Sequence, residues 1–225
     1  MSTVDRHAVG DAVNSVRQRM RELSGDRAVE LIAVTKGFGF DAVAAVVAAG
    51  CHSIGESYAQ ELREKLAAAD GVAIPEVHFI GRLQTNKVKS IAHLVAVWHS
   101  VDRVAVADVV AARAAGARVF VQVNTTAEAD KGGCSPADTE TLVAHCRTLG
   151  LVVLGLMTVG PTSGDSGPTR SAFSLLRHQA DELGLESCSM GMSNDFEIAI
   201  EQGSTHVRIG SALFGERPLR SPQMR

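Results

Sequence analysis

The sequence predicts a single-domain α/β protein in which eight strand–helix units close into a (β/α)₈ barrel, with one extra helix in front. Short runs of branched apolar residues alternate with helical segments along the chain, a pattern typical of a parallel sheet. About eight such units can be counted, whereas a doubly wound open sheet usually has fewer strands. Apolar residues make up 45% of the 225 residues, enough for one large core. We therefore assign residues 1–225 to one domain.

The extra helix is expected over about residues 5–23, because its apolar positions fall on one face with arginines opposite: Val9, Ala12, Val13, Val16 and Met20. Four apolar residues, Leu31–Val34, then form a short strand buried on both faces. We expect Asp41 to cap the helix that follows, over residues 42–49, and Gly50 to end it.

The remaining units follow the same alternation. Further strands are predicted at residues 51–55, 76–81, 94–99, 118–124, 151–157, 187–190 and 205–209. Helices are predicted over residues 58–69, 85–92, 169–183, 194–201 and 211–214, with two more: one capped by Asp102 and running to residue 115, and one opened by Ser135 or Asp138 and ending at Gly150. Residues 159–168 have the composition of a flexible loop.

The composition argues against several classes of protein. The formal net charge is −3 without a basic excess, so we expect no nucleic-acid partner. No apolar run is long enough to span a membrane, and the first residues are too polar for a signal peptide. The four cysteines form no CxxC pair, and the histidines show no metal-binding spacing. We expect a cytoplasmic protein with reduced cysteines and without a metal site.

Lys36 follows the first buried strand directly and precedes Gly37-Phe38-Gly39, which cannot continue that strand. An ammonium group at this place admits two interpretations. Either the strand ends and the lysine reaches water over its packed stem, or the lysine has a lowered pKa and forms a Schiff base with an aldehyde.

The barrel places a second feature beside Lys36. In a closed barrel the eighth strand lies next to the first, and the loops after strands seven and eight often bind phosphate. These loops contain Ser193, which offers a hydroxyl, and Gly210-Ser211, whose amides are available at a helix start. Arg208 adds a positive charge. Taken singly, an ordinary helix cap and a surface ion pair would explain the same residues.

A ligand with both an aldehyde and a phosphate would satisfy the two features. Pyridoxal 5'-phosphate fits, and so does an aldolase-type sugar phosphate. A third hypothesis is a dinucleotide site, because Gly37–Ala42 fits GxGxxA and Glu56 lies about 20 residues further on. That hypothesis prefers an open sheet and leaves Lys36 unused.

Several blocks of the sequence resemble the pyridoxal phosphate homeostasis proteins, single-domain relatives of the alanine racemase barrel. The blocks occur in the same order over nearly the whole chain: Ala33–Lys36, Ile54–Glu61, His78–Lys87, Gly155–Met157, Met190–Ser193 and Val207–Gly215. The resemblance implies that Lys36 forms the Schiff base, that Ser193, Arg208, Gly210 and Ser211 hold the phosphate, and that Ser57 and Met157 lie near the cofactor. The family usually has asparagine where this chain has Ser57, so the contact there is expected to differ.

The resemblance implies a protein that carries or buffers pyridoxal phosphate without an established turnover, with pyridoxal phosphate-dependent apoenzymes as the expected recipients. We expect a monomer. The alternative is a small amino-acid racemase, which would need acid and base groups on both faces of the cofactor. We expect no β-rich second domain like that of alanine racemase after the eighth unit. Tyr58, the only tyrosine, has packing or a hydrogen bond as its simplest role.

Overall fold

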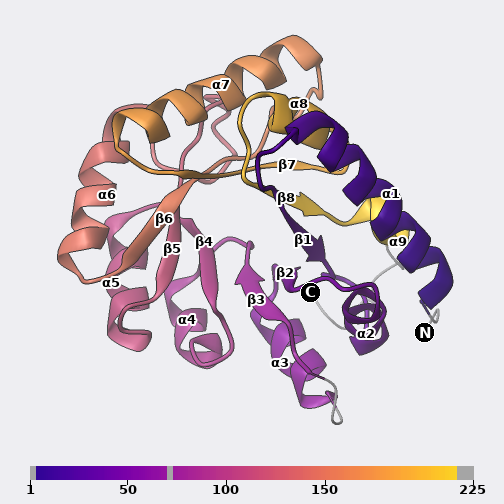
Figure 1. Cartoon of the computed structure of the whole chain (residues 1–225). Helices are drawn as coiled ribbons and strands as arrows, with labels where there is room; N and C mark the ends of the chain where they lie inside the picture. The colour runs from indigo at the N-terminus through magenta and orange to yellow at the C-terminus, as the bar shows by residue number, and fades with distance from the viewer. Residues whose placement is uncertain (1–3, 70–72, 217–225) are drawn as a thin grey trace.

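The predicted barrel is confirmed in a computed structural model, which describes residues 4–69 and 73–216. Eight parallel strands form a closed barrel in the order β1 to β8, so that β8 pairs with β1 (Figure 1). The strands are β1 (Glu30–Val34), β2 (Ser53–Glu56), β3 (Glu76–Phe79), β4 (Val97–Val101), β5 (Arg118–Gln122), β6 (Val152–Met157), β7 (Ser187–Met192) and β8 (His206–Ile209).

A helix follows each strand, and one more precedes the barrel. The helices are α1 (Arg6–Ser24), α2 (Phe40–Ala48), α3 (Ala59–Ala67), α4 (Thr85–Ile91), α5 (Val104–Arg113), α6 (Thr139–Thr148) after the 3-10 turn η1 (Pro136–Asp138), α7 (Ser166–Glu182), α8 (Phe196–Glu201) and α9 (Ser211–Phe214). The extra helix α1 packs against α2, α8 and α9, and so covers the outside of the closure between β1 and β8 (Figure 1).

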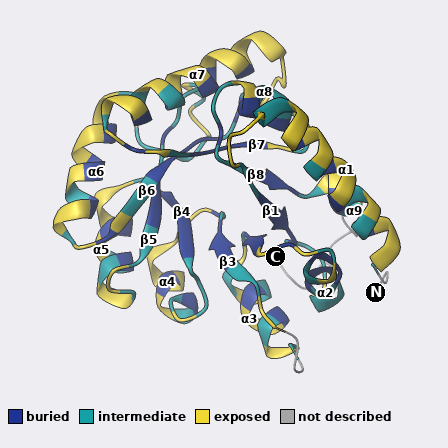
Figure 2. Ribbon diagram, in the orientation of Figure 1, coloured by how far each residue is buried: buried dark blue, intermediate teal, exposed yellow. Residues whose placement is uncertain are grey.

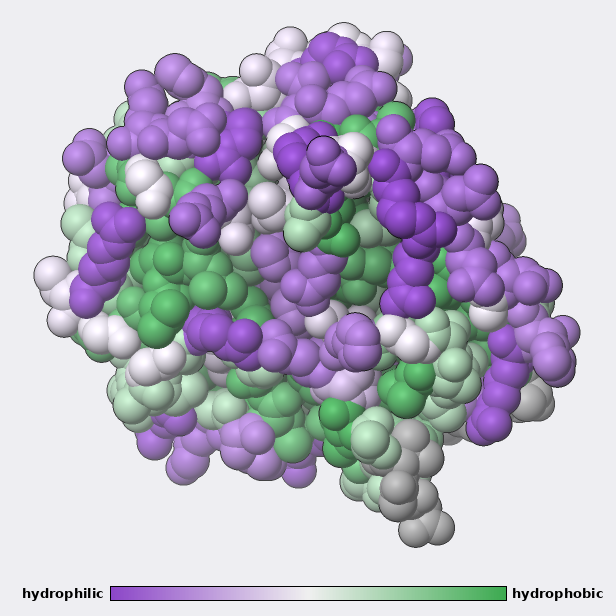
Figure 3. Space-filling view, in the orientation of Figure 1, coloured by the Kyte–Doolittle hydropathy of each residue, from purple (hydrophilic) through white to green (hydrophobic). Residues whose placement is uncertain are grey.

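Each helix turns its apolar side toward the strands. The predicted stripe of α1 is buried at Val9, Val13, Val16 and Met20, while Ala12 is half-buried. Figure 2 shows buried residues along the strands and exposed residues on the outer faces of the helices. Hydrophilic side chains cover most of the face in Figure 3, with smaller apolar patches between them. In the described part of the chain, no helix has the length and apolar character that crossing a membrane requires.

Two predicted helix caps are wrong. Asp41 lies inside the first turn of α2, after the cap residue Gly39, and its Oδ2 accepts a hydrogen bond from the amide of Val4 at 2.9 Å. Asp102 is not the cap of α5 either, because Arg103 holds that position and pairs with the Asp102 carboxylate. Both carboxylates instead serve neighbours outside the first turn. Gly50 does end its helix as predicted, with a φ of 74° that suits glycine.

The barrel closes by pairing Ile32 with Arg208 and Ala33 with Ile209. Beyond these pairs, Val34 and Gly210 are neighbours, and a Cβ placed on Gly210 would lie 3.4 Å from the Cβ and the carbonyl oxygen of Val34. The chain segments after β1 and β8 therefore leave the barrel side by side, at the end where (β/α)₈ proteins have their sites.

Candidate functional site

A cavity of about 200 Å³ opens where β1, β7 and β8 end. Five of the seven residues predicted for the site line it: Lys36, Ser193, Arg208, Gly210 and Ser211. The walls are completed by Val34, Phe38, Ile80, Met192, Asn194, Asp195 and Gly215. Pockets for drug-sized ligands measure about 300–1,000 Å³, so this cavity suits a smaller molecule.

Lys36 is half-buried, and the backbone on both sides of it is held by side chains from α3. Lys65 donates a hydrogen bond from Nζ to the carbonyl oxygen of Thr35 at 2.8 Å. Glu61 accepts a hydrogen bond from the amide of Gly37 at 2.5 Å. One helix thus fixes the residue before Lys36 and the residue after it.

A buried ion pair anchors this clamp. Lys65 pairs with Glu56, and their side chains are 2% and 0% exposed. Glu56 also accepts a hydrogen bond from the hydroxyl of Thr35 at 2.5 Å. Burial raises the pKa of Glu56, while the charge of Lys65 opposes that rise. The dinucleotide hypothesis needs Glu56 to bind a ribose, but these partners enclose its carboxylate at the end of β2. That hypothesis also depends on an open sheet, whereas the barrel is closed.

The turns after β7 and β8 are joined by one hydroxyl group. Ser193 Oγ accepts hydrogen bonds from the amides of Gly210 and Ala212, each at 3.2 Å. A hydroxyl has two acceptor lone pairs and one proton, so the Ser193 proton remains to be donated to a third group. The amide of Ser211 lies between these two amides and has no acceptor within residues 4–69 and 73–216. Two donors therefore remain at this wall of the cavity, which suits an anion.

Arg208 lies deeper than these turns and is only 4% exposed. Its guanidinium donates to Ser189 Oγ at 2.7 Å and to the carbonyl oxygen of Thr158 at 2.8 Å. Burial lowers its pKa to about 10, and the carboxylate of Asp195 opposes the shift, so Arg208 stays positively charged near neutral pH. It contributes positive charge to the cavity, although two of its donors are used within the barrel.

The other two predicted residues do not line the cavity. Met157 is 2% exposed and packs with Val97 and Phe120 in a core cluster. Ser57 is half-buried just after β2, where its backbone lies against Gly81. The sequence analysis also missed the clamp residues Lys65 and Glu61; their i, i+4 spacing on a helix close after the Lys36 strand was the available signal.

Comparisons with known proteins identify the family of the chain. Residues 4–218 match the family described as alanine racemase, N-terminal domain. A pyridoxal phosphate homeostasis protein of Aquifex aeolicus is 39% identical over 204 residues, which cover 86% of this chain and 89% of that protein. The chain belongs to the pyridoxal phosphate homeostasis protein family. The predicted resemblance is thereby confirmed.

Two more similar proteins extend the comparison over nearly the whole chain. The pyridoxal phosphate homeostasis protein of Pseudomonas aeruginosa is 37% identical over 230 residues and covers 99% of both chains. The solved structure of PipY from Synechococcus elongatus, with pyridoxal phosphate bound, has a TM-score of 0.82 at 28% identity and covers 92% of this chain and all of that one.

Proposed function

We propose that this chain binds pyridoxal 5'-phosphate in the cavity between β1, β7 and β8 and takes part in the homeostasis of that cofactor. Lys36 would hold the aldehyde as a Schiff base, and the turns at Ser193, Gly210 and Ser211 would hold the phosphate. The observation that carries the proposal is that one cavity joins an amine and two unused anion donors from opposite ends of the sequence. The relatives named for pyridoxal phosphate favour this cofactor over a sugar phosphate.

Each residue has a separate task in this proposal. When bound, the cofactor supplies an aldehyde carbon that bonds to the Lys36 amine with loss of water. The α3 clamp keeps the backbone of Lys36 in place, so little conformational entropy is lost on binding. Ser193 donates its hydroxyl proton toward the anion, and Arg208 lowers the electrostatic cost of bringing a phosphate into the cavity. Ser57 and Met157 would act at most indirectly, since neither lines the cavity.

Reduction with borohydride tests the assignment of Lys36. The full chain is mixed with pyridoxal phosphate and its visible absorption is recorded. The protein is then reduced with borohydride and digested, and the masses of its peptides are measured by mass spectrometry. We expect a visible band and one stable adduct on the peptide that contains Lys36. The Lys36→Ala variant should lose both, and the matched variant of an exposed lysine, Lys87→Ala, should keep both. A band that persists in Lys36→Ala refutes the assignment.

A racemase is the alternative, and the match to the alanine racemase N-terminal domain family is the observation in its favour. Among the described residues that line the cavity, the only titratable side chains are Lys36, Asp195 and Arg208. Tyr58 is 41% exposed and is not among them. We propose that turnover is absent. Incubation of the loaded protein with single enantiomers of alanine, followed by chiral chromatography, should show no inversion; steady inversion would favour the racemase.

We further propose that the protein works as a cytoplasmic monomer that passes the cofactor to apoenzymes. All four cysteines are free thiols, as a reducing compartment would keep them. Light scattering should give the mass of one chain, 23.7 kDa. Mixing the loaded protein with a pyridoxal phosphate-dependent apoenzyme should restore that enzyme's activity faster than the cofactor dissociates into solution. A rate no faster than dissociation would argue against direct transfer.

A further inference from the structure

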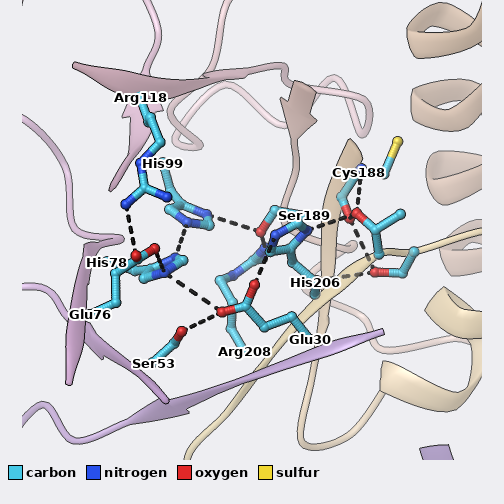
Figure 4. A network of polar contacts seen from close by, with 12 residues as sticks. Glu30, Ser53, Glu76, His78, His99, Arg118, Cys188, Ser189, His206 and Arg208 are labelled. Carbon is cyan, nitrogen blue, oxygen red and sulfur yellow. Dashed lines mark hydrogen bonds and ion pairs between the residues drawn. The ribbon is translucent and has the colours of Figure 1, made fainter. Parts of the chain in front are cut away.

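A chain of hydrogen bonds runs through the interior of the barrel from Arg208 to the opposite opening (Figure 4). Arg208 contacts Ser189 Oγ at 2.7 Å, and Ser189 Oγ lies 3.0 Å from His99 Nδ1. His99 Nε2 lies 2.8 Å from His78 Nδ1, and His78 Nε2 lies 3.2 Å from Glu76 Oε1. These groups belong to β8, β7, β4 and β3. The proposed binding of the cofactor does not use His99, His78 or Glu76.

Both ends of this chain have a fixed hydrogen-bonding role. An arginine side chain can only donate, and an ionised carboxylate can only accept. Ser189 Oγ must therefore accept from Arg208. In the described structure its own proton has one acceptor within reach, His99 Nδ1, and leaving a buried hydroxyl proton unpaired is costly.

The direction then passes from residue to residue. His99 is fully buried, and burial lowers its pKa well below the usual value, with His78, Arg208 and His206 acting in the same sense. A neutral His99 that accepts at Nδ1 carries its proton on Nε2, and it donates that proton to His78 Nδ1. Burial also lowers the pKa of His78, although the negative charges of Glu30 and Glu76 oppose this shift. A neutral His78 then donates from Nε2 to Glu76.

The carboxylate end of this series of hydrogen bonds is open to solvent. Glu30 and Glu76 begin β1 and β3, at the end of the barrel away from Lys36, and their side chains are 40% and 37% exposed. They line a separate cavity of about 530 Å³ there, together with Ser53 and Arg118. Hydrogen bonds from His206 and, to a smaller extent, Ser53 lower the pKa of Glu30 to about 2 against the effect of burial, so it is ionised. Within the described residues, no group of three or more histidine, cysteine, aspartate or glutamate side chains could hold a metal ion.

We propose that Ser189, His99 and His78 are positioning residues that form a one-directional hydrogen-bond relay, which holds the guanidinium of Arg208 against the cofactor cavity from the opposite opening of the barrel. Ser189 presents its lone pairs to Arg208 only because His99 takes its proton. His99 Nδ1 can accept that proton only while the His99 proton sits on Nε2 and is donated to His78 Nδ1. The charge that Arg208 adds to the cavity is thus oriented by carboxylates on the other face of the protein.

Nitrogen NMR of the imidazole rings tests the relay without any cofactor. In the ¹⁵N-labelled full chain near pH 7.5, His99 and His78 are assigned from the signals lost in His99→Gln and His78→Gln. We expect both rings to be neutral, with a bare Nδ1 and a protonated Nε2. A doubly protonated ring, or a ring with its proton on Nδ1, would overturn the proposal.

A second measurement tests the link to Arg208 and rests on the proposed function. Ser189→Ala removes one of the two acceptors of Arg208 and the donor to His99, and leaves the carbonyl oxygen of Thr158 in place. We expect a mixed tautomer at His99 and an affinity for pyridoxal phosphate about tenfold weaker, because a buried donor loses its partner. The matched control is Ser100→Ala, since Ser100 is also a buried strand serine but its hydroxyl has no partner among the described residues. Its affinity and tautomers should equal those of the native chain.

The outcomes separate the two proposals. An unchanged His99 tautomer and an unchanged affinity in Ser189→Ala would refute the relay while the native chain still binds pyridoxal phosphate. Failure of the native chain to bind pyridoxal phosphate would refute the proposed function, and the tautomers in the cofactor-free protein would still decide the relay.

Discussion

The amide of Gly210 donates a hydrogen bond to Ser193 Oγ at 3.2 Å, which joins the turn after β8 to the turn after β7. Ala212 makes the same contact, so both lone pairs of the hydroxyl are occupied. The remaining proton can only be donated, and an anion in the cavity is the acceptor that would gain most from it. The contact therefore connects the closure of the barrel with the preference for a phosphate.

Ser193→Ala should weaken the binding of pyridoxal phosphate more than it weakens the fold. A hydrogen bond to a charged group contributes about 1.5–3 kcal/mol, so we expect the dissociation constant to rise at least about tenfold. Titration by visible absorption measures this, and the band should still appear at saturating cofactor because Lys36 is unchanged. Ser171→Ala, at an exposed position of α7, is the matched control. Equal affinity in the two variants would remove Ser193 from the site.

Two glycines of the barrel should respond differently to alanine. A Cβ on Gly155 would lie 1.8 Å from the carbonyl oxygen of Ser187, a backbone atom that cannot easily move. We expect Gly155→Ala to lower the free energy of unfolding by about 3 kcal/mol or to prevent folding. The nearest atoms to a Cβ on Gly210 are at 3.4 Å, an ordinary contact, so Gly210→Ala should stay within about 0.5 kcal/mol of the native chain. Urea unfolding measures both, and a loss at Gly210 as large as at Gly155 would contradict this account.

The sequence predicts the barrel well because the alternation of apolar strands and helices repeats along the chain. It also predicts that Lys36 and Gly210 lie together, because closure brings the first and last strands side by side. Helix caps were harder. Asp41 and Asp102 have the right residue type for a cap, but each carboxylate has another partner. Asp41 accepts from Val4, 37 residues away, whereas Asp102 pairs with the adjacent Arg103, which itself takes the cap position.

The inner parts of the site depend on contacts between distant strands. Ser189 and His99 are 90 residues apart, and no local pattern pairs them. Met157 stands in a family-like block at the end of β6, and the structure places it against Phe120 in the core. The direction in which a strand residue points near the end of a barrel is set by the register of its neighbours, and β5, β7 and β8 all take part in register shifts.

Lys65→Met should destabilise the protein strongly. Lys65 is 2% exposed and pairs with Glu56, and removing one partner of a buried pair leaves the other charge uncompensated, at a cost of about 3–5 kcal/mol. The double variant Glu56→Gln/Lys65→Met should recover much of that loss, because it removes both charges. Urea unfolding of the two single variants and the double variant gives the coupling energy. Additive losses would show that the pair does not act as a unit.

The same Glu56 and Lys65 variants also test how the clamp affects the binding of pyridoxal phosphate at Lys36. Because Lys65 holds the carbonyl oxygen of Thr35, both Lys65 variants should bind pyridoxal phosphate more weakly, even where the double variant regains stability. The absorbance titration measures this at a temperature where each variant is folded. Native affinity in a folded Lys65 variant would show that the clamp is not needed to position Lys36.

Acid should destabilise the protein in two steps. Burial lowers the pKa values of His78 and His99 below the 6.5 of an unfolded chain, so the unfolded state binds more protons below that pH. Their contribution is fully present above pH 6.5 and is lost as the pH falls toward their folded pKa values. Each proton taken up on unfolding adds a slope of about 1.4 kcal/mol per pH unit. Glu30, with a pKa of about 2 against 4.5, contributes a second loss between those two values.

Urea unfolding at a series of pH values measures these slopes. The groups that face the two rings are Glu30 on β1, Glu76 on β3, and His206 and Arg208 on β8, and all of them are kept in the variants. His99→Gln should reduce the slope between pH 6.5 and 5 by up to about 1.4 kcal/mol per unit, whatever its stability at pH 7.5. The exposed His178→Gln, on the outer face of α7, should leave the slope unchanged. Identical slopes in the native chain and His99→Gln would mean that His99 takes up no proton on unfolding, which would contradict a pKa lowered by burial.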